Sequence, residues 1–206
     1  MQQATVQLGK IGIQAIVNTM GVSVAAAFAV VNRIDDFAYT PEQNIAHAMT
    51  ALMAQNKGAG KRDRMREGFR CGLVLEVIYG IFIFLVCYLL ARPLMLLFVK
   101  DEEVIGHGVT YLHLISLMYV LPALTNGLQG FFRGIGDMKV TLISSFVNMG
   151  VRVLAAIPLV FMLGLGIEAL PYSYLAGWVG MLLVETPLLV RIYRRGELQL
   201  KHTNGK

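Results

Sequence analysis

The chain has 206 residues, of which 56% are hydrophobic and only 15% are charged. A soluble domain usually carries about 25% charged residues, so this composition excludes an ordinary soluble domain and indicates a helical membrane protein. The formal net charge is +5, but the basic residues gather in a few loops. The positive-inside rule explains that pattern without a nucleic-acid partner.

The hydrophobic segments predict an all-α protein, with six transmembrane helices bundled in a single domain over residues 1–206. Several segments exceed the roughly 18 apolar residues that indicate a membrane span. Short polar clusters separate them. The expected spans, in chain order, are residues 4–20, 22–54, 71–91, 109–132, 140–163 and 169–192.

The first two spans are the most polar. The second would be about 50 Å long as one helix, against a hydrocarbon core of ~30 Å. We therefore expect it to be tilted, to be kinked at Pro41, or to extend beyond the bilayer. Residues 93–99 are too few to cross, and we expect an interfacial turn there.

Orientation follows from the loops. Most Lys and Arg residues follow the second, fourth and sixth spans, in residues 55–70, 133–139 and 191–206. With six spans these segments lie on one side of the membrane. The positive-inside rule makes that side the cytoplasm. We expect a multi-pass protein of the cell (inner) membrane with both termini in the cytoplasm.

Charged residues inside a membrane are costly and need an explanation. Arg33 and Asp36 lie three residues apart, so they can form an ion pair on one helix face, while Asp35 points elsewhere. A structural ion pair and a place in a water-filled cavity both remain open. The candidates for a substrate or ion cavity are Arg33, Asp35, Asp36, Gln14, Asn18, Asn126 and Gln129.

Glu76, Glu185 and Arg152 are further charges within the expected spans. Glu76 and Glu185 each lie about six residues from a basic loop, so we expect them to reach the interface or a nearby Arg. Arg152 is a single buried cation, and we expect it to pair with a carboxylate or with carbonyl groups of another helix. The spacing of Gly127, Gly130 and later glycines favours tight helix packing.

The sequence does not indicate an enzyme. It contains no nucleophile motif and no phosphate-binding glycine loop. No Cys and His residues have the spacing of metal ligands, so we expect no metal site.

Three segments resemble the C-terminal lobe of MATE proteins, the multidrug and toxic compound extrusion transporters. The stretch from Val24 to Gly68 resembles that lobe's first full helix and the basic loop after it. The segment GFFRGIGDMK, Gly130 to Lys139, is similar to the family's Arg-Gly-x-Gly turn. Val151 to Leu170 looks like the family's eleventh helix.

The resemblance implies that the spans are helices seven to twelve of a twelve-helix, two-lobed antiporter. Such proteins export small organic, often cationic, drugs by alternating access, and sodium or proton entry drives them. We expect no cofactor beyond that coupling ion. The expected partners are membrane lipid and either the N-terminal lobe, which these residues lack, or a second copy. The matched motifs suggest structural or gating roles for Pro41, Gln55, Asn56, Gly58, Arg133, Gly134, Gly136 and Arg152.

One departure from the family concerns an acidic residue that one sodium-linked branch carries in the tenth helix. Pro122 stands at the corresponding position here. The strongest charged candidates in this lobe are therefore Asp35, Asp36 and Arg33. Two other functions remain open: a related flippase for lipid-linked saccharides, and a non-transporting membrane fragment that needs a partner lobe.

Overall fold

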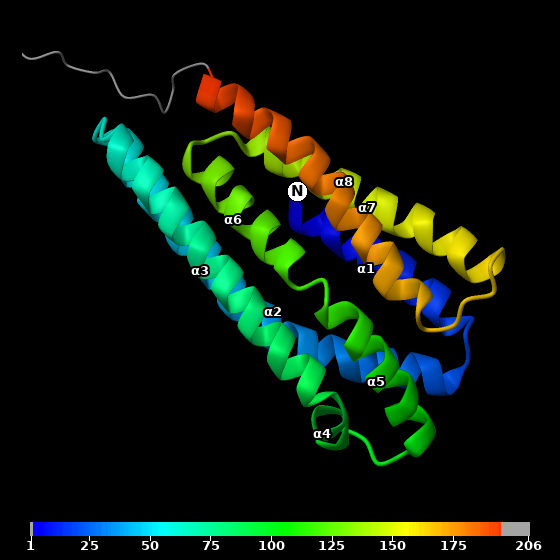
Figure 1. Ribbon diagram of the computed structural model, residues 1–206. Helices are drawn as coiled ribbons and strands as arrows, with labels where there is room; N and C mark the ends of the chain where they lie inside the picture. The colour runs from blue at the N-terminus through cyan, green and yellow to red at the C-terminus, as the bar shows by residue number, and fades with distance from the viewer. Residues whose placement is uncertain (1, 195–206) are drawn as a thin grey trace, which may run out of the picture.

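The computed structural model describes residues 2–194, and the side chains of residues 9–192. Over the described residues the chain is helical and has no strand, which confirms the expected all-α class. The helices are α1 (Gln2–Asn18), α2 (Val22–Gly58), α3 (Arg62–Leu89), α4 (Ala91–Leu96), α5 (Glu102–Ser116), α6 (Val120–Gly134), α7 (Met138–Phe161) and α8 (Ala169–Arg194) (Figure 1).

Three helices are long and apolar enough to cross a membrane on their own: α3, α7 and residues 169–192 of α8. The helices α5 and α6 meet the same test only as a pair, and they are bent by 53° at the break between them. The span that we expected at residues 109–132 contains this break. Pro122 has no N–H to continue the hydrogen bonding of α5, and it lies in the first turn of α6, where a proline is tolerated.

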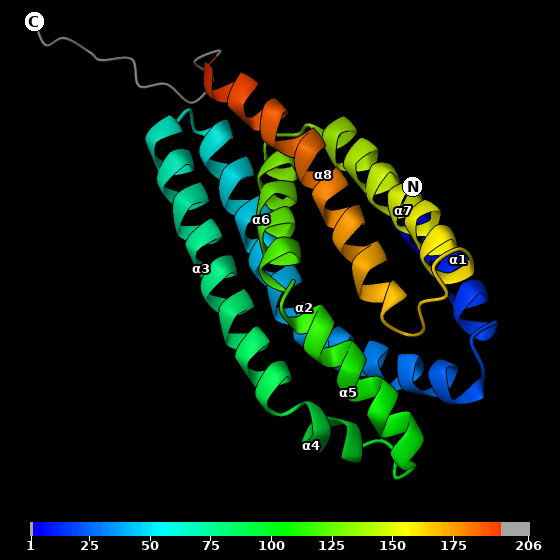
Figure 2. The same cartoon turned by 45° about the vertical axis from the view of Figure 1, so that its right-hand side comes forward.

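The second helix, α2, continues for 37 residues through Pro41, a length of about 55 Å. Figure 2 shows it bending between its two halves, and both α2 and α3 run on into the basic turn that joins them. The expected interfacial turn at residues 93–99 is instead a short helix, α4, that begins at Ala91. A hydrogen bond from Leu94 N to Leu90 O supports its first turn.

The helices pack mainly in two groups. One group contains α2, α3, α5 and α6, and the other contains α1, α7 and α8. An apolar core that includes Phe28, Tyr111, Ile115 and Leu170 joins the groups near α5 and α8. Toward the turn that joins α2 and α3, α6 lies between α3 and α8 in both views (Figures 1 and 2).

Glycines allow α6 to lie directly against α2. A Cβ atom at Gly130 would stand 2.6 Å from the carbonyl oxygen of Ala46, and one at Gly134 would stand 2.7 Å from that of Thr50. The hydroxyl of Thr50 also donates a 3.1 Å hydrogen bond to Gly130 O. Small residues commonly permit such close backbone packing between membrane helices, so the glycine spacing has the packing role that we expected.

Candidate functional site: the two faces of α2

The exposed face of α2 is mostly polar, although Phe37 is also exposed there. Arg33, Asp36, Thr40, Asn44 and His47 recur every three or four residues and are exposed. By contrast, the exposed side chains along the middle of α3 are large and apolar, as at residues 74, 78, 82 and 85. A polar helix face at membrane depth is tolerated against protein or in a water-filled cavity, not against lipid. The face that α2 leaves uncovered therefore belongs to a cavity or to a partner.

The expected ion pair between Arg33 and Asp36 is not formed. Both side chains are exposed, and the one ion pair among the described side chains is Arg92–Glu102, at 2.9 Å. Exposed ions three residues apart gain little from pairing, because each remains solvated and pairing restricts both side chains. On the neighbouring helix α1, the amide of Gln14 donates a 2.9 Å hydrogen bond to Asn18, and both residues are also exposed.

Asp35 lies on the opposite, buried face of α2. It is 5% exposed, and its carboxylate accepts a 2.5 Å hydrogen bond from the hydroxyl of Tyr119, which is fully buried at the start of α6. The ring of Tyr119 packs edge-on against Tyr39, with centroids 5.5 Å apart. The adjacent residues Asp35 and Asp36 thus point to the two sides of one helix.

Two turns along the same buried face lies Glu42, which the sequence analysis missed. Its side chain is fully buried. The amide of Asn126 donates a 3.3 Å hydrogen bond to Oε2, and Oε1 has no partner. The helical repeat gives the signal that could have found it, because Asp35 and Glu42 are seven residues apart and so share a face.

Glu76 of α3 completes this buried acidic group. It packs beside Gly127 of α6, where an added Cβ would lie 3.5 Å from its Cγ. Both of its carboxylate oxygens are buried without a hydrogen-bond partner, and its charge acts on Glu42. The expectation that Glu76 reaches the interface was wrong, because it points between the helices rather than along them. We call Asp35, Glu42 and Glu76 the buried carboxylates.

Glu185 is a second correction. It is fully buried on α8, where Ser144 of α7 and Gln129 of α6 face its carboxylate. Arg133 of α6 acts on it electrostatically without forming an ion pair. Nearby, Gln129 donates a 3.4 Å hydrogen bond to Ser145 of α7. Polar side chains of α6, α7 and α8 therefore meet where the two helix groups join.

Arg152 does not pair with a carboxylate. Its guanidinium lies 3.7 Å from the ring centroid of Tyr174 and 5.7 Å from that of Trp178, both on α8. Its Nε is buried without a hydrogen-bond partner. A cation–π interaction in a desolvated site contributes about 2 kcal/mol. This stacking takes the place of the expected ion pair or carbonyl contact.

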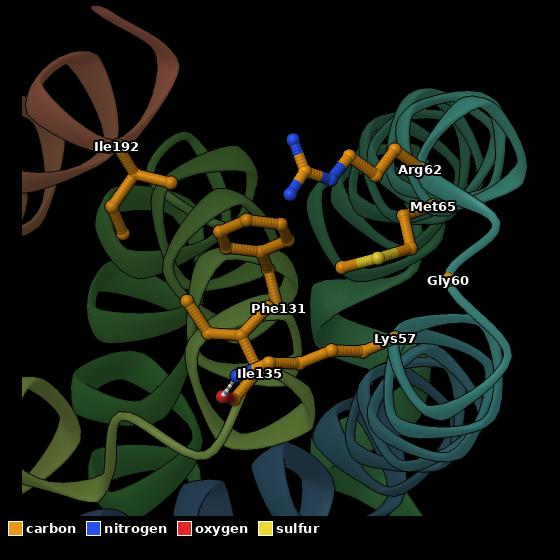
Figure 3. Close-up of a pocket in the computed structure, with 7 residues that line it drawn as sticks. All are labelled: Lys57, Gly60, Arg62, Met65, Phe131, Ile135 and Ile192. Atoms are coloured by element: carbon orange, nitrogen blue, oxygen red, sulfur yellow. Dashed lines mark hydrogen bonds between the residues drawn. The ribbon is translucent and has the colours of Figure 1, made fainter. Parts of the chain in front are cut away.

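Pro41 lies near the middle of α2, whereas the other remaining candidates lie at the basic end of the lobe. There Gln55 and Gly58 are exposed, and Asn56 donates a 2.8 Å hydrogen bond to Leu52 O. Gly136 has a φ of +85°, a conformation that favours glycine in the turn after α6. Lys57 donates a hydrogen bond to Ile135 O and so ties the end of α2 to that turn (Figure 3).

These features define a helical membrane protein whose second helix has a polar exposed face and buried carboxylates behind it. The chain belongs to the MatE family, whose model matches residues 1–158. Solved structures share the fold. The chain aligns over its full length with a crystal structure of MATE in the bent conformation, at 16% identity and a TM-score of 0.87, and covers 46% of that chain.

Curated relatives include the Probable multidrug resistance protein YoeA of Bacillus subtilis, 27% identical over 85% of this chain and 36% of its own length. Another is the Probable multidrug resistance protein NorM of Thermotoga maritima, 22% identical over 72% of this chain and 31% of its own. The chain therefore spans about a third of the length of the curated relatives that it matches.

Proposed function

We propose that this chain is the C-terminal lobe, helices seven to twelve, of a multidrug exporter that works by cation antiport with alternating access. Two curated relatives named for multidrug resistance support the export of drugs. The chain's share of their length and its six predicted spans support the assignment to one lobe. In this proposal it is a transporter and not an enzyme.

The comparison with solved structures also supports alternating access. The chain matches a structure described as outward-facing with a TM-score of 0.86 and one described as inward-facing with a TM-score of 0.85. A lobe that fits both states equally well can move as one body against its partner. The basic residues Lys57, Arg62, Lys139 and Arg191 share one end of the bundle. By the positive-inside rule this supports a cytoplasmic position for that end and for both termini.

The observation that carries the proposal is the division of α2 into a polar exposed face and a buried acidic face. The exposed face, with Gln14 and Asn18 of α1 beside it, lines the cavity opposite the N-terminal lobe. Asp36 supplies a carboxylate that attracts an organic cation there. Ionisable groups within membrane helices commonly mark such substrate and ion pathways.

The buried carboxylates carry the coupling ion, which we propose is a proton. Ionised carboxylates packed together in an apolar interior repel each other and lose their hydration, so such groups hold protons unless a cation joins them. Arg152 of α7 and Lys10 of α1 act electrostatically on Asp35. Apart from Asp35, the groups facing Glu42 are Glu76 from α3 and Asn126 from α6, and neither supplies a positive charge. Asn126, which hydrogen-bonds to Glu42, is itself half-buried.

The test is drug export by the full-length transporter in cells that lack their own exporters. Expression should lower ethidium or norfloxacin accumulation, and dissipating the proton gradient should abolish the effect. Unchanged accumulation at normal membrane levels, together with activity in a lipid-flipping assay, would instead support the saccharide-lipid flippase. Inactivity in both assays would leave a membrane fragment that does not transport.

A further inference from the structure

Two adjoining hollows open at the basic end of the helices, where α2, α3, α6 and α8 come together. The first, of about 340 Å³, is shown in Figure 3. The second, of about 670 Å³, shares three of its lining residues, Lys57, Ile135 and Ile192. We call the two together the basic cleft.

The lining of the basic cleft is strongly cationic. Lys57 and Arg62 line the first hollow, and Lys139 and Arg191 join Lys57 in the second, where Asp137 is the one lining carboxylate. Within the described part of the chain, Lys57, Lys139 and Arg191 form no ion pair. Lys57 uses one of its three donors on the carbonyl of Ile135. The cleft therefore carries more positive than negative charge among its lining residues.

The inner wall of the same cleft is apolar. Met65 and Phe131 are buried beneath the cations, and Ile135 and Ile192 flank them (Figure 3). Over the described residues α3 and α8 pack against α6 but not against each other. Farther along α3, from Val74 onward, the exposed side chains are large and apolar.

From this arrangement we infer that the basic cleft binds an anionic glycerophospholipid, with the headgroup phosphate among Lys57, Lys139 and Arg191. Its acyl chains would lie against the apolar wall of the cleft and along the apolar side chains that α3 exposes. A phosphate accepts hydrogen bonds from several cations at once, and basic pockets between transmembrane helices suit anionic lipid headgroups. The apolar wall and the membrane location favour a lipid over a free phosphate ion. This site is independent of the proposed drug cavity, which lies on the exposed face of α2.

The test is native mass spectrometry of the purified chain with phosphatidylglycerol or phosphatidylcholine. We expect phosphatidylglycerol to be retained preferentially. Each basic residue near an anionic headgroup contributes about five-fold in affinity. The triple variant Lys57→Gln/Lys139→Gln/Arg191→Gln should therefore bind phosphatidylglycerol about a hundred-fold more weakly, with unchanged helix content by circular dichroism.

The matched control is Lys61→Gln/Arg64→Gln/Arg70→Gln, which removes the same charge from exposed residues that do not line the cleft. The control should retain the lipid. Equal loss of phosphatidylglycerol binding in both variants would show diffuse attraction to the basic surface. Unchanged binding by the cleft variant would contradict the proposed site. Equal competition by inorganic phosphate would contradict the lipid assignment.

A second readout does not depend on substitutions. A phosphatidylglycerol with a photoreactive acyl chain should label peptides that contain Met65, Phe131 or Ile192. Labelling confined to the far end of α3 would overturn the proposed position.

Discussion

The hydroxyl of Tyr119 donates a 2.5 Å hydrogen bond to the carboxylate of Asp35 and so joins the start of α6 to the middle of α2. Both side chains are buried. The bond lies next to the break between α5 and α6, so it links the bent span to the helix that carries the polar face. A contact of this kind fixes the position of α6 against α2 as well as stabilising the lobe.

Removing that hydroxyl should destabilise the lobe. Tyr119→Phe leaves a buried carboxylate without its donor, which costs about 1–3 kcal/mol. Thermal unfolding in detergent measures the loss. Tyr39→Phe is the matched control, because the Tyr39 hydroxyl is buried without a partner and its removal should be neutral or slightly stabilising. Equal effects of the two substitutions would show that the hydrogen bond does not contribute.

The close packing of α6 on α2 gives a second prediction. Gly130→Ala places a methyl group against the Ala46 carbonyl, where no flexible side chain can yield, and should destabilise by about 1–3 kcal/mol. Gly150→Ala on α7 adds the same methyl group where no atom lies within 4 Å. It should stabilise by about 0.5–1 kcal/mol. Denaturation of both variants beside the unchanged chain tests this, and a tolerated Gly130→Ala would contradict the packing.

Much of the fold follows from the lengths of the apolar segments and from the polar residues that separate them. The expected starts of α1, α2, α7 and α8 lie within two residues of the observed ones, because long apolar segments bounded by polar residues leave few alternatives in a membrane. The break before α6 could not be predicted with the same ease. A proline within an apolar segment is compatible with either a kink or an interruption, and the surrounding helices decide between them.

The site was less predictable. The separation of Asp35 from Asp36 follows from helical periodicity, but the pairing of Arg33 with Asp36 does not follow from spacing alone. Glu76 and Glu185 are buried because neighbouring helices cover them. Their distance along the chain from a basic loop does not indicate which helices pack over them. The partner of Arg152 is an aromatic ring on another helix, which a search for carboxylates cannot identify.

The polar face of α2 predicts a role for Asp36 in drug export. Asp36→Asn in the full-length transporter should lower ethidium export at normal membrane levels, because the exposed carboxylate that attracts the cation is lost. Asp63→Asn removes an exposed carboxylate of the α3 first turn and should leave export unchanged. Accumulation in cells and immunoblots of membranes provide the two measurements. Wild-type export by Asp36→Asn would remove this residue from the drug pathway.

Stacking of Arg152 on Tyr174 predicts that the planar guanidinium is preferred at this position. Arg152→Lys should destabilise the lobe by about 1 kcal/mol, since an ammonium group stacks less well on a ring. Tyr174→Phe keeps the ring and should be tolerated better than Tyr174→Leu. Thermal unfolding ranks the three variants, and equal stability of Phe and Leu at position 174 would contradict the stacking.

The measurement that tests the account most directly is drug uptake into proteoliposomes containing the full-length transporter, with an acidic lumen and no sodium. Protons leaving the lumen should drive ethidium inward. Glu42→Gln/Glu76→Gln should abolish this gradient-driven uptake while ethidium still binds, and Glu67→Gln, exposed on the same helix as Glu76, should retain it. Full uptake by the double variant, or uptake that a sodium gradient drives and a pH gradient does not, would contradict proton coupling through the buried carboxylates.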